Sequence, residues 1–530
     1  MSNSFLKRLK ADPEYFEFWQ DLDEYCKDLK IPSKKEFVDS LPILFKRIEN
    51  DGASYSIYQA LSKFTANNPK DAIEILSMIE KEGTKETLEF SASILSGLSL
   101  SKTSFLYKEK IIEFVNSTDE TKIYSGVDAA YRITFKNKKE ESKFLNEVHN
   151  TLKKDLNNKP KRCLGIIARF YNKHLNIIGE AKSLIIDLLK LKNVIVQSEV
   201  ARSLNEEFKP EEDLIYFQNC LNLLTFTNAK YEGIYNTIRF RLKDLTNSHP
   251  NVIIEFIDNW IINNSKNLRE ISVLKGTIED LYFNHPEVIK KLFLDWLNSN
   301  NSLYKFALPF VINDLSSKID AISLPKKPII GLSEKDCVYI VYMIVGHILD
   351  RKYASEMLYS ILEAKWNSER VRNHIATLFA KHLIKNYYSV TDILKKKRKT
   401  ANKTIKSVID QIINDSENYY QQFTELELVN EFEPSDKRMH YFSKQQGIKM
   451  QKLMDDSERK RDFFTDMLTK VNLRAGKSFF SKYRGEYSQE SEMQSFRSSF
   501  EVARVQSIDE IGQEKLILMW QNMKRDELPN

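Results

Sequence analysis

The strongest constraint on the fold is a gapless internal repeat. Residues 242–260 read LKDLTNSHPNVIIEFIDNW and residues 278–296 read IEDLYFNHPEVIKKLFLDW, so the two copies are offset by 36 residues. The shared positions are Asp244 with Asp280, Leu245 with Leu281, His249-Pro250 with His285-Pro286, Val252-Ile253 with Val288-Ile289, and Trp260 with Trp296. A repeat of this length is typical of arrays in which each copy is one supersecondary unit stacked on the next.

Each copy predicts a pair of helices. Proline is favoured in the first turn of a helix, because its missing N–H would have no partner there. Pro250 and Pro286 are therefore each expected to begin a helix. Trp260 and Trp296 come late in these first helices, where a large side chain can fill the space between stacked units. One helix pair cannot bury its own apolar face, so neighbouring pairs must stack.

Helical spacing of apolar residues extends along most of the chain. Ala181, Leu184, Ile185, Leu188 and Leu189 follow the pattern of a single helix face. Helix breakers are scarce, with 14 Gly and 13 Pro in 530 residues, which favours helices over a turn-rich β fold. Similar apolar stripes fall at about 34–48, 70–82, 102–115, 138–156 and 211–226. Ser33 with Glu36 predicts a helix cap. Pro69 and Pro210 are expected to open further helix pairs.

The period and the helix pairing resemble the HEAT and armadillo class of α-solenoids over residues 34–320. The resemblance concerns the architecture and no specific family within that class. It implies a long surface suited to a protein partner. An irregular helical bundle is the structural alternative. The predicted fold class is all-α: stacked helix pairs (a HEAT-like α-solenoid) followed by a basic helical C-terminal region.

Two breaks divide the predicted helices. Residues 324–333, LPKKPIIGLS, contain two prolines and a glycine, after which Ser333 and Asp336 are expected to begin a new helix. A second break is the sequence EPSD at 433–436. We therefore predict a helical-repeat solenoid at 1–324, a helical continuation with a basic face at 333–432, and a C-terminal helical region, first basic and then acidic, at 436–530.

Cysteine spacing and apolar segments restrict the environment. The four cysteines, Cys26, Cys163, Cys220 and Cys337, form no CxxC pair. We expect reduced thiols rather than a disulfide framework or a zinc site. The start of the chain lacks the apolar core of a secretory signal. The longest apolar stretch, residues 338–349, is shorter than the roughly 20 residues of a membrane helix. These features predict a cytoplasmic protein with no membrane partner, metal or cofactor.

The net charge of +6 is distributed unevenly. Residues 371–412 carry a net charge of +8 and residues 436–485 a net charge of +7. Residues 413–435 carry −6 and residues 486–530 carry −4. The first 370 residues are nearly neutral, so the basic surface belongs to the C-terminal third of the chain.

The first basic block is LKKKRKTANKTIKSVIDQII, residues 394–413. Read as one helix, it has an apolar stripe and, offset by two residues, a row of lysines on the opposite face. The apolar stripe consists of Ala401, Ile405, Val408 and Ile412. The row of lysines consists of Lys399, Lys403 and Lys406. Four further cations lie just upstream: Lys395, Lys396, Lys397 and Arg398. A dense cationic face can release counterions from a nucleic-acid backbone. A solvated helix face, or a basic loop that aids solubility, is the alternative.

The second basic block is RAGKSFFSKYRGEY, residues 474–487. Its cations are interleaved with aromatic residues: Arg474, Lys477, Lys482 and Arg484 alternate with Phe479, Phe480, Tyr483 and Tyr487. Aromatic rings can stack on unpaired bases while cations hold phosphates. The alternative is that Phe479 and Phe480 are core residues of a closing helix.

No catalytic motif is complete. Gly476-Lys477-Ser478 resembles the end of a P-loop, but Val471 stands where that loop needs glycine. Arg169 and His174 have the spacing of the HEPN ribonuclease motif, a spacing that arises by chance in a chain with eight histidines. His374 and His382 are too far round a helix to share a metal. His249 and His285 recur with the repeat and are expected to form structural hydrogen bonds at turns.

We interpret the chain as a non-enzymatic binding or scaffold protein, with a solenoid for a protein partner and a basic C-terminal region for nucleic acid. The candidate nucleic-acid-binding residues are Lys395, Lys396, Lys397, Arg398, Lys399, Lys403, Lys406, Arg474, Lys477, Phe479, Lys482, Tyr483 and Arg484. One alternative is a protein–protein adaptor that binds an acidic protein. Another is a helical nuclease or DNA-repair enzyme on a HEAT-like frame, which predicts a cluster of buried carboxylates or a bound metal.

Overall fold

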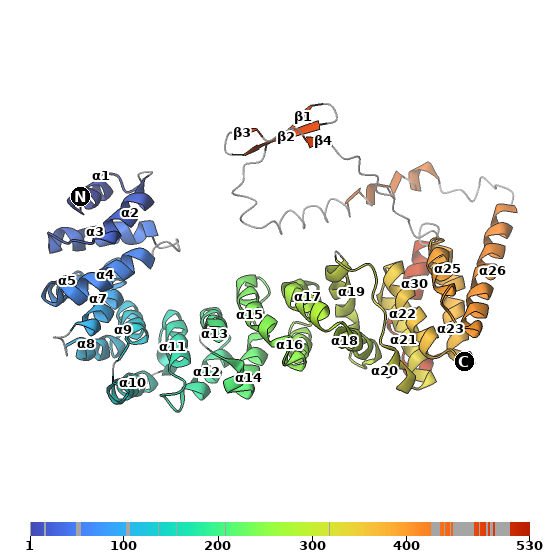
Figure 1. The fold of residues 1–530 in the computed structure, drawn as a ribbon, viewed down its shortest axis with the longest axis horizontal. Coiled ribbons are helices and arrows are strands. Elements are labelled where there is room, and N and C mark those ends of the chain that lie inside the picture. The colour runs from blue at the N-terminus through green and yellow to red at the C-terminus, as the bar shows by residue number, and fades with distance from the viewer. Residues whose placement is uncertain are drawn as a thin grey trace. The chain divides into compact units, whose positions relative to one another are not determined.

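Helices make up most of the chain in the computed structural model (Figure 1). The structure describes residues 2–14, 17–48, 55–101, 106–135, 137–154, 156–206, 208–316, 318–425, 435–438, 440–441, 443–445, 447–448, 471–475, 478–483, 486–487, 491–492 and 509–529. The chain divides into two compact units, of which unit 1 is Met1–Leu292 with Asn301–Ser317 and unit 2 is Phe293–Asn300 with Lys318–Asn530.

Unit 1 consists of helices in which alternate members pack together. Its helices are α1 (Ser2–Ala11), α2 (Phe18–Lys27), α3 (Lys34–Ile48), α4 (Tyr55–Asn67), α5 (Pro69–Glu82), α6 (Lys85–Leu88), α7 (Ser91–Leu100), α8 (Leu106–Val115), α9 (Glu120–Arg132), α10 (Lys138–Lys153), α11 (Lys161–Lys173), α12 (Ala181–Lys190), α13 (Val194–Glu206), α14 (Leu214–Leu224), α15 (Glu232–Leu245), α16 (Pro250–Asn263), α17 (Lys275–Asn284) and α19 (Ser302–Ser316), with short 3-10 segments η2 (Leu156–Asn158), η3 (Pro210–Glu212) and η4 (Leu268–Leu274). In one layer α7 packs on α9, α9 on α11, α11 on α13 and α13 on α15. In the other, α12 packs on α14 and α14 on α16.

The two repeat copies adopt the same local structure. His249 has φ −138° and ψ 57° before α16, and His285 has φ −137° and ψ 65° before α18 (Pro286–Asn298). Each histidine N–H bonds to a leucine carbonyl four residues earlier, at 2.8 Å in both copies. Trp260 is fully buried and Trp296 is 2% exposed, each late in the helix that its proline begins. The predicted helix register is confirmed at these positions.

The histidines themselves act at these turns mainly through the backbone. The His249 ring bonds to the Ser248 hydroxyl at 2.8 Å. The buried Nε2 of His285 has no hydrogen-bond partner among the described residues. The prediction that both rings form structural hydrogen bonds is therefore correct for His249 alone.

Other helix signals are confirmed in unit 1. α3 begins after Ser33, whose hydroxyl accepts a hydrogen bond from the Glu36 N–H at 3.3 Å. Pro69 lies in the first turn of α5. Pro210 instead opens the 3-10 segment η3 ahead of α14. On α12, four of the five stripe residues are buried and Leu184 is half-buried.

Unit 2 is built around one buried helix. Its elements are α20 (Lys326–Gly331), α21 (Glu334–His347), α22 (Arg351–Ala364), α23 (Glu369–Leu378), the π-helical segment η5 (Phe379–Leu383), α24 (Ile384–Asn386), α25 (Val390–Arg398), α26 (Lys403–Glu425), α30 (Glu510–Gln521) and η7 (Arg525–Glu527). Every residue of α21 from Cys337 to His347 is buried, and the helix packs against α22, α23 and α30. The longest apolar stretch of the sequence is thus the centre of this unit. In the part of the chain that the structure describes, no helix combines the length and apolarity needed to span a membrane.

The predicted break at 324–333 contains a short helix. Pro325 lies at the N-cap of α20 and Pro328 in its first turn, where proline is tolerated. The expected new helix is confirmed: the Ser333 hydroxyl accepts a hydrogen bond from the Asp336 N–H at 3.1 Å and caps α21. The second predicted break, at Glu433 and Pro434, lies outside the described residues.

The prediction of a helical C-terminal region is wrong over residues 471–492. These residues contain four short strands, β1 (Val471–Ala475), β2 (Ser478–Tyr483), β3 (Glu486–Tyr487) and β4 (Ser491–Glu492). β2 pairs antiparallel with each of the other three. Two residues, including Gly476, separate Ala475 from its partner Ser478, a spacing typical of a tight hairpin. These residues therefore form paired strands where a helix was predicted.

The last described helix, α30, packs against α21 within unit 2. Trp520 of α30 is buried against Gly346, where an added Cβ would lie 3.1 Å from the Trp520 Cβ. The Gln521 side chain donates a hydrogen bond to the Gly346 carbonyl at 2.8 Å. Arg525 pairs with Asp336 at 3.0 Å and lies 4.5 Å over the Tyr339 ring. A glycine on α21 thus makes room for the C-terminal helix.

Candidate functional site

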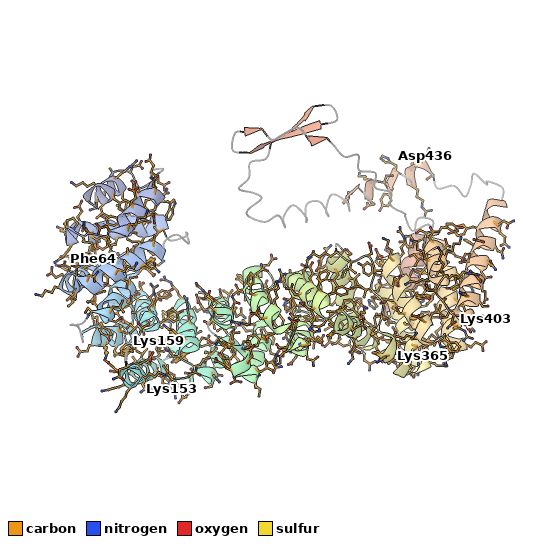
Figure 2. All side chains as sticks on the ribbon, viewed as in Figure 1. Phe64, Lys153, Lys159, Lys365, Lys403 and Asp436 are labelled. Carbon is orange, nitrogen blue, oxygen red and sulfur yellow. The ribbon has the colours of Figure 1, made fainter. Side chains whose placement is uncertain are left out.

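The first basic block folds as two helices. A turn containing Lys399 separates α25 from α26. Asn402 caps the second helix, since its side-chain oxygen accepts a hydrogen bond from the Ile405 N–H at 2.9 Å. The prediction that Lys399, Lys403 and Lys406 form a row on one helix is therefore wrong. Instead, the block brings cations to both sides of the turn, and Lys403 is the first residue of α26 (Figure 2).

The apolar face of α26 differs slightly from the predicted stripe. Ile405 and Ile412 are each 1% exposed, as the pattern indicates, and Ile409 is fully buried. Val408 is half-buried, and Ala401 lies in the turn. α26 packs against α23 and α25, and α25 also packs against α22.

Arg398 is neutralised by an acid on the neighbouring helix. Its guanidinium forms two hydrogen bonds with the Asp410 carboxylate, of which Nη2 to Oδ2 is 2.9 Å long. The side-chain hydrogen bond from Arg398 lowers the pKa of Asp410, and the same bond raises the pKa of Arg398. A bidentate pair of this kind leaves little of the arginine charge available to a ligand.

Lys395 and Lys397 are also paired. The Lys397 ammonium lies 2.8 Å from Glu356 of α22 and 5.1 Å from the centre of the Tyr359 ring. The Lys395 ammonium lies 3.5 Å from Glu417 of α26. Three of the seven cations predicted in this block therefore have acidic partners, and they are poor candidates for ligand binding.

Four lysines remain around the α25–α26 turn. We call Lys396, Lys399, Lys403 and Lys406 the turn lysines. Within the described ranges none of them is within 4.0 Å of an acidic group. The first three are exposed and Lys406 is half-buried. Lys406 is close enough to Asp410 to contribute to its lowered pKa, after the larger effect of Arg398. The turn lysines are the uncompensated part of the predicted site.

The second basic block lies partly in the short strands. Arg474 in β1 is the cross-strand partner of Phe479 in β2, which also contains Lys482 and Tyr483. Lys477 and Arg484, with the P-loop-like glycine, lie outside the described residues. Phe479 and Phe480 are therefore not residues of a closing helix, and their role in stacking stays a prediction.

A further cationic face lies in unit 1, on α11. The sequence of this helix, KRCLGIIARFYNK, contains four cations and no acid. Three of these cations, Arg162, Arg169 and Lys173, share one face of the helix because they are seven and four residues apart. We call these three residues the α11 cations. Arg162 lies 4.7 Å over the Tyr124 ring, and Arg169 lies 4.5 Å over the Tyr131 ring. The Lys173 ammonium is 4.6 Å from the same Tyr131 ring.

Two carboxylates flank the α11 cations. Glu89, with 9% of its side chain exposed, forms an ion pair with Arg162, and Glu199 of α13 lies 3.7 Å from Arg169. Gly165 allows this approach of α13, since an added Cβ would be 2.5 Å from the Ile195 side chain and 3.4 Å from the Glu199 Cγ. Burial raises the pKa of both carboxyls, although the neighbouring arginines lower it.

A third carboxylate lies beside them on α9. Asp128, with 8% of its side chain exposed, accepts hydrogen bonds from Arg132 at 2.6 and 3.0 Å. Burial, with the charges of Asp128 and Glu89, raises the pKa of the Tyr124 hydroxyl to about 12. Each of the three carboxylates is thus held by its own arginine. No three His, Cys, Asp or Glu side chains in the described part of the chain are arranged to hold a metal ion.

Arg169 and His174 occupy different environments. Arg169 reaches Tyr131 and Glu199 on the neighbouring helices. His174 is 3% exposed, and its ring packs at 5.1 Å against Phe170. Burial lowers the pKa of His174 to about 3. The histidine is therefore a neutral core residue at physiological pH, unsuited to transfer protons with Arg169.

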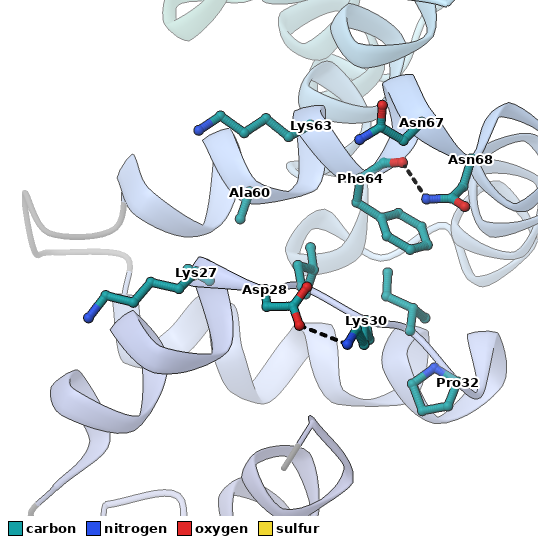
Figure 3. Close-up of a pocket in the computed structure, with 12 residues that line it drawn as sticks. Lys27, Asp28, Lys30, Pro32, Ala60, Lys63, Phe64, Asn67 and Asn68 are labelled. Atoms are coloured by element: carbon teal, nitrogen blue, oxygen red, sulfur yellow. Dashed lines mark hydrogen bonds and ion pairs between the residues drawn. The ribbon is translucent and has the colours of Figure 1, made fainter.

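A cavity of about 540 Å³ lies between α4 and the segment that follows α2 (Figure 3). Lysines line it, but Lys30 pairs with Asp28 at 2.8 Å (Figure 3) and Lys27 pairs with Asp23 at 2.9 Å. Lys63 is exposed at its edge. These pairs leave the cavity with little net charge for an anionic ligand.

No protein-family model and no curated protein matches this chain. The α11 cations were absent from the candidate nucleic-acid-binding residues, because residues 1–370 carry almost no net charge. The signal that could have identified them is the composition of a single helix, because residues 161–173 contain four cations and no acidic residue.

Proposed function

We propose that this chain is a binding protein whose α25–α26 turn holds nucleic acid through the phosphates. The four turn lysines carry the proposal, because they are grouped around one turn and have no acidic partner among the described residues. Lysines that neutralise phosphates release condensed counterions, which favours binding in a sequence-independent way. Arg474, Lys477, Phe479, Lys482, Tyr483 and Arg484 belong to the same proposal as a second contact region.

The architecture that we propose is a HEAT-like α-solenoid. The packing of alternate helices in two layers of unit 1, and the similar backbone geometry at His249 and His285, support it. Solenoids of this kind present extended surfaces, and in this proposal the helix pairs of unit 1 bind a protein partner. We place the protein in the cytoplasm, where thiols stay reduced, in keeping with its free cysteines.

The test is a salt series with the full chain. Fluorescence anisotropy would measure its affinity for a labelled oligothymidylate and a labelled duplex. Changing all four turn lysines to Gln should weaken binding to both probes. It should also reduce the slope of log K against log salt by roughly 3 on the single strand, since each phosphate contact contributes about 0.7. None of the four is fully buried, so the far-UV circular dichroism should not change.

A matched control comes from exposed lysines of unit 1 that have no acidic partner within the described ranges. They are Lys139, Lys154, Lys209 and Lys291. Changing them to Gln removes the same charge and should leave the salt slope near that of the wild type. A wild-type chain that binds neither DNA nor RNA at low salt would contradict the proposal. In that case binding to polyglutamate would favour the adaptor that recognises an acidic protein.

The enzymatic alternative has one supporting observation, the buried carboxylates Glu89 and Asp128. Each of them is occupied by an arginine, so neither is available as a ligand for a metal ion or as a base for water. The discriminating assay is incubation of labelled DNA and RNA with the chain and Mg²⁺. Cleavage that Asp128→Asn abolishes would establish a nuclease, and intact substrate would leave binding as the activity.

A further inference from the structure

We infer that the cavity between α4 and residues 28–32 binds an extended peptide segment of a protein partner, which places an apolar side chain in the cavity and pairs its backbone with residues 29–31. The inference rests on the proposed function, in which unit 1 binds a protein, and it names the site and the kind of ligand. The cavity has a volume of about 540 Å³, within the roughly 300–1,000 Å³ of ligand sites in proteins.

One wall of the cavity is a segment whose backbone has no partner. Residues 29–31 lie in neither a helix nor a strand. The N–H and C=O groups of Leu29, Lys30 and Ile31 form no hydrogen bond with another described residue. Ile31 precedes Pro32, which restricts the Ile31 backbone to extended conformations. An extended segment with unpaired backbone groups can pair with a second extended chain.

The opposite wall is one face of α4. Ala60, Phe64 and Asn67 have the spacing of residues on one side of a helix, and all three line the cavity. Figure 3 shows the Phe64 ring pointing from α4 towards the segment that contains Pro32. Ile31, which is 9% exposed, and Ala60, which is 7% exposed, add to this apolar lining. The cavity is therefore suited to an apolar side chain.

The charges at the cavity determine the polar part of the ligand. Lys27 and Lys30 are each paired with an aspartate. Burial raises the pKa of the Cys26 thiol to about 11, so this lining residue is neutral at physiological pH. Lys63 is exposed at the edge and has no acidic partner within the described ranges. The peptide that fits has an acidic residue near its apolar one, whereas a nucleic-acid strand would bring one negative charge with every nucleotide.

The experiment selects peptides from a phage-displayed library of random dodecapeptides on the full chain. The selected peptides are synthesised with a fluorescent label, and anisotropy measures their affinity. Asn67→Trp blocks the cavity from an exposed position and should weaken binding by about tenfold or more, the value of one buried apolar side chain. Asn236→Trp, at an exposed position of α15, is the matched control and should leave the affinity unchanged.

The acidic residue of the peptide is tested at the edge of the cavity. Lys63→Gln should weaken binding about two- to fivefold, the range of one exposed charge pair. Lys70 of α5 is also exposed and has no acidic partner in the described part of the chain, so Lys70→Gln is the control. Backbone pairing is tested on the peptide itself by methylating one amide nitrogen at a time. Affinity should fall at alternate positions, because successive N–H groups of an extended chain point to opposite sides.

Cys26 reports directly whether the cavity is occupied. It lines the cavity and is half-buried, whereas the other three cysteines are buried. The bound peptide should slow the reaction of Cys26 with iodoacetamide, followed by mass spectrometry. Peptides that bind without protecting Cys26, or that bind Asn67→Trp equally well, overturn this site but leave a protein-binding function in place. A library that yields no binding peptide overturns the site and the protein-binding role of unit 1 together. The salt series with oligothymidylate tests the turn lysines separately.

Discussion

His174 should make unit 1 sensitive to mild acid. Its ring is 3% exposed, packs against Phe170, and has no hydrogen-bond partner for Nε2 in the described part of the chain. Burial, with a smaller effect of the Lys173 charge, lowers its pKa from 6.5 to about 3. The folded state therefore excludes a proton that the unfolded chain binds at any pH below about 6.5.

The direction and the size of this pH effect on stability follow from the difference in proton binding between the folded and unfolded states. A lowered histidine pKa costs no stability above pH 6.5, and stability falls progressively as the pH drops from 6.5 towards 3. Each pH unit in this window costs about 1.4 kcal/mol, so the loss from His174 at pH 5 is about 2 kcal/mol. Replacing the ring with an uncharged side chain removes the titration.

The assay is urea unfolding followed by far-UV circular dichroism at pH 7.5 and pH 5. The free energy of unfolding of the wild type should fall by about 2 kcal/mol more between these pH values than that of His174→Gln. His440, which is exposed, supplies the control: His440→Gln should show the same loss as the wild type. Equal losses in the wild type and His174→Gln would refute the reasoning, because they would mean that the folded protein accepts a proton at this ring.

Two further predictions concern packing. Trp260 is fully buried, so Trp260→Ala should lower the free energy of unfolding by about 3–5 kcal/mol. Trp366 has 46% of its surface exposed, so the control Trp366→Ala should lower it by about 0.5 kcal/mol or less. Similar losses of stability in the two variants would contradict the proposed stacking role of Trp260. Gly97→Ala should cost about 1–3 kcal/mol by overpacking, because the new Cβ would lie 1.8 Å from the Thr65 hydroxyl and 2.3 Å from the Ser62 carbonyl of α4. An unchanged urea midpoint for Gly97→Ala would show that α4 and α7 can separate without penalty.

Local signals predicted the helices well, because they act over one or two turns. The repeat placed Pro250 and Pro286 at helix starts, and the apolar stripe of α12 came from spacing alone. The same kind of signal was missed at Asn402, where an N-cap divides the basic block into two helices. A two-residue hairpin spacing was likewise missed between Ala475 and Ser478.

The candidate site could not be predicted in the same way, because charge pairing joins residues that are distant in the sequence. Lys397 was a candidate for binding nucleic acid because it lies in a basic block, yet the fold brings Glu356 of another helix to 2.8 Å. Arg162 meets Glu89 across 73 residues, and no spacing rule connects them.

The sequence by itself determined where helices begin, which faces are apolar and which segments are basic. These properties depend on backbone geometry and on neighbours within about four residues. The tertiary structure decided which of the cations keep their charge available. That outcome depends on which helices pack together, as Gly165 shows by letting α13 bring Glu199 to Arg169. A salt bridge forms over a few ångströms in space, and only the packed chain sets that distance.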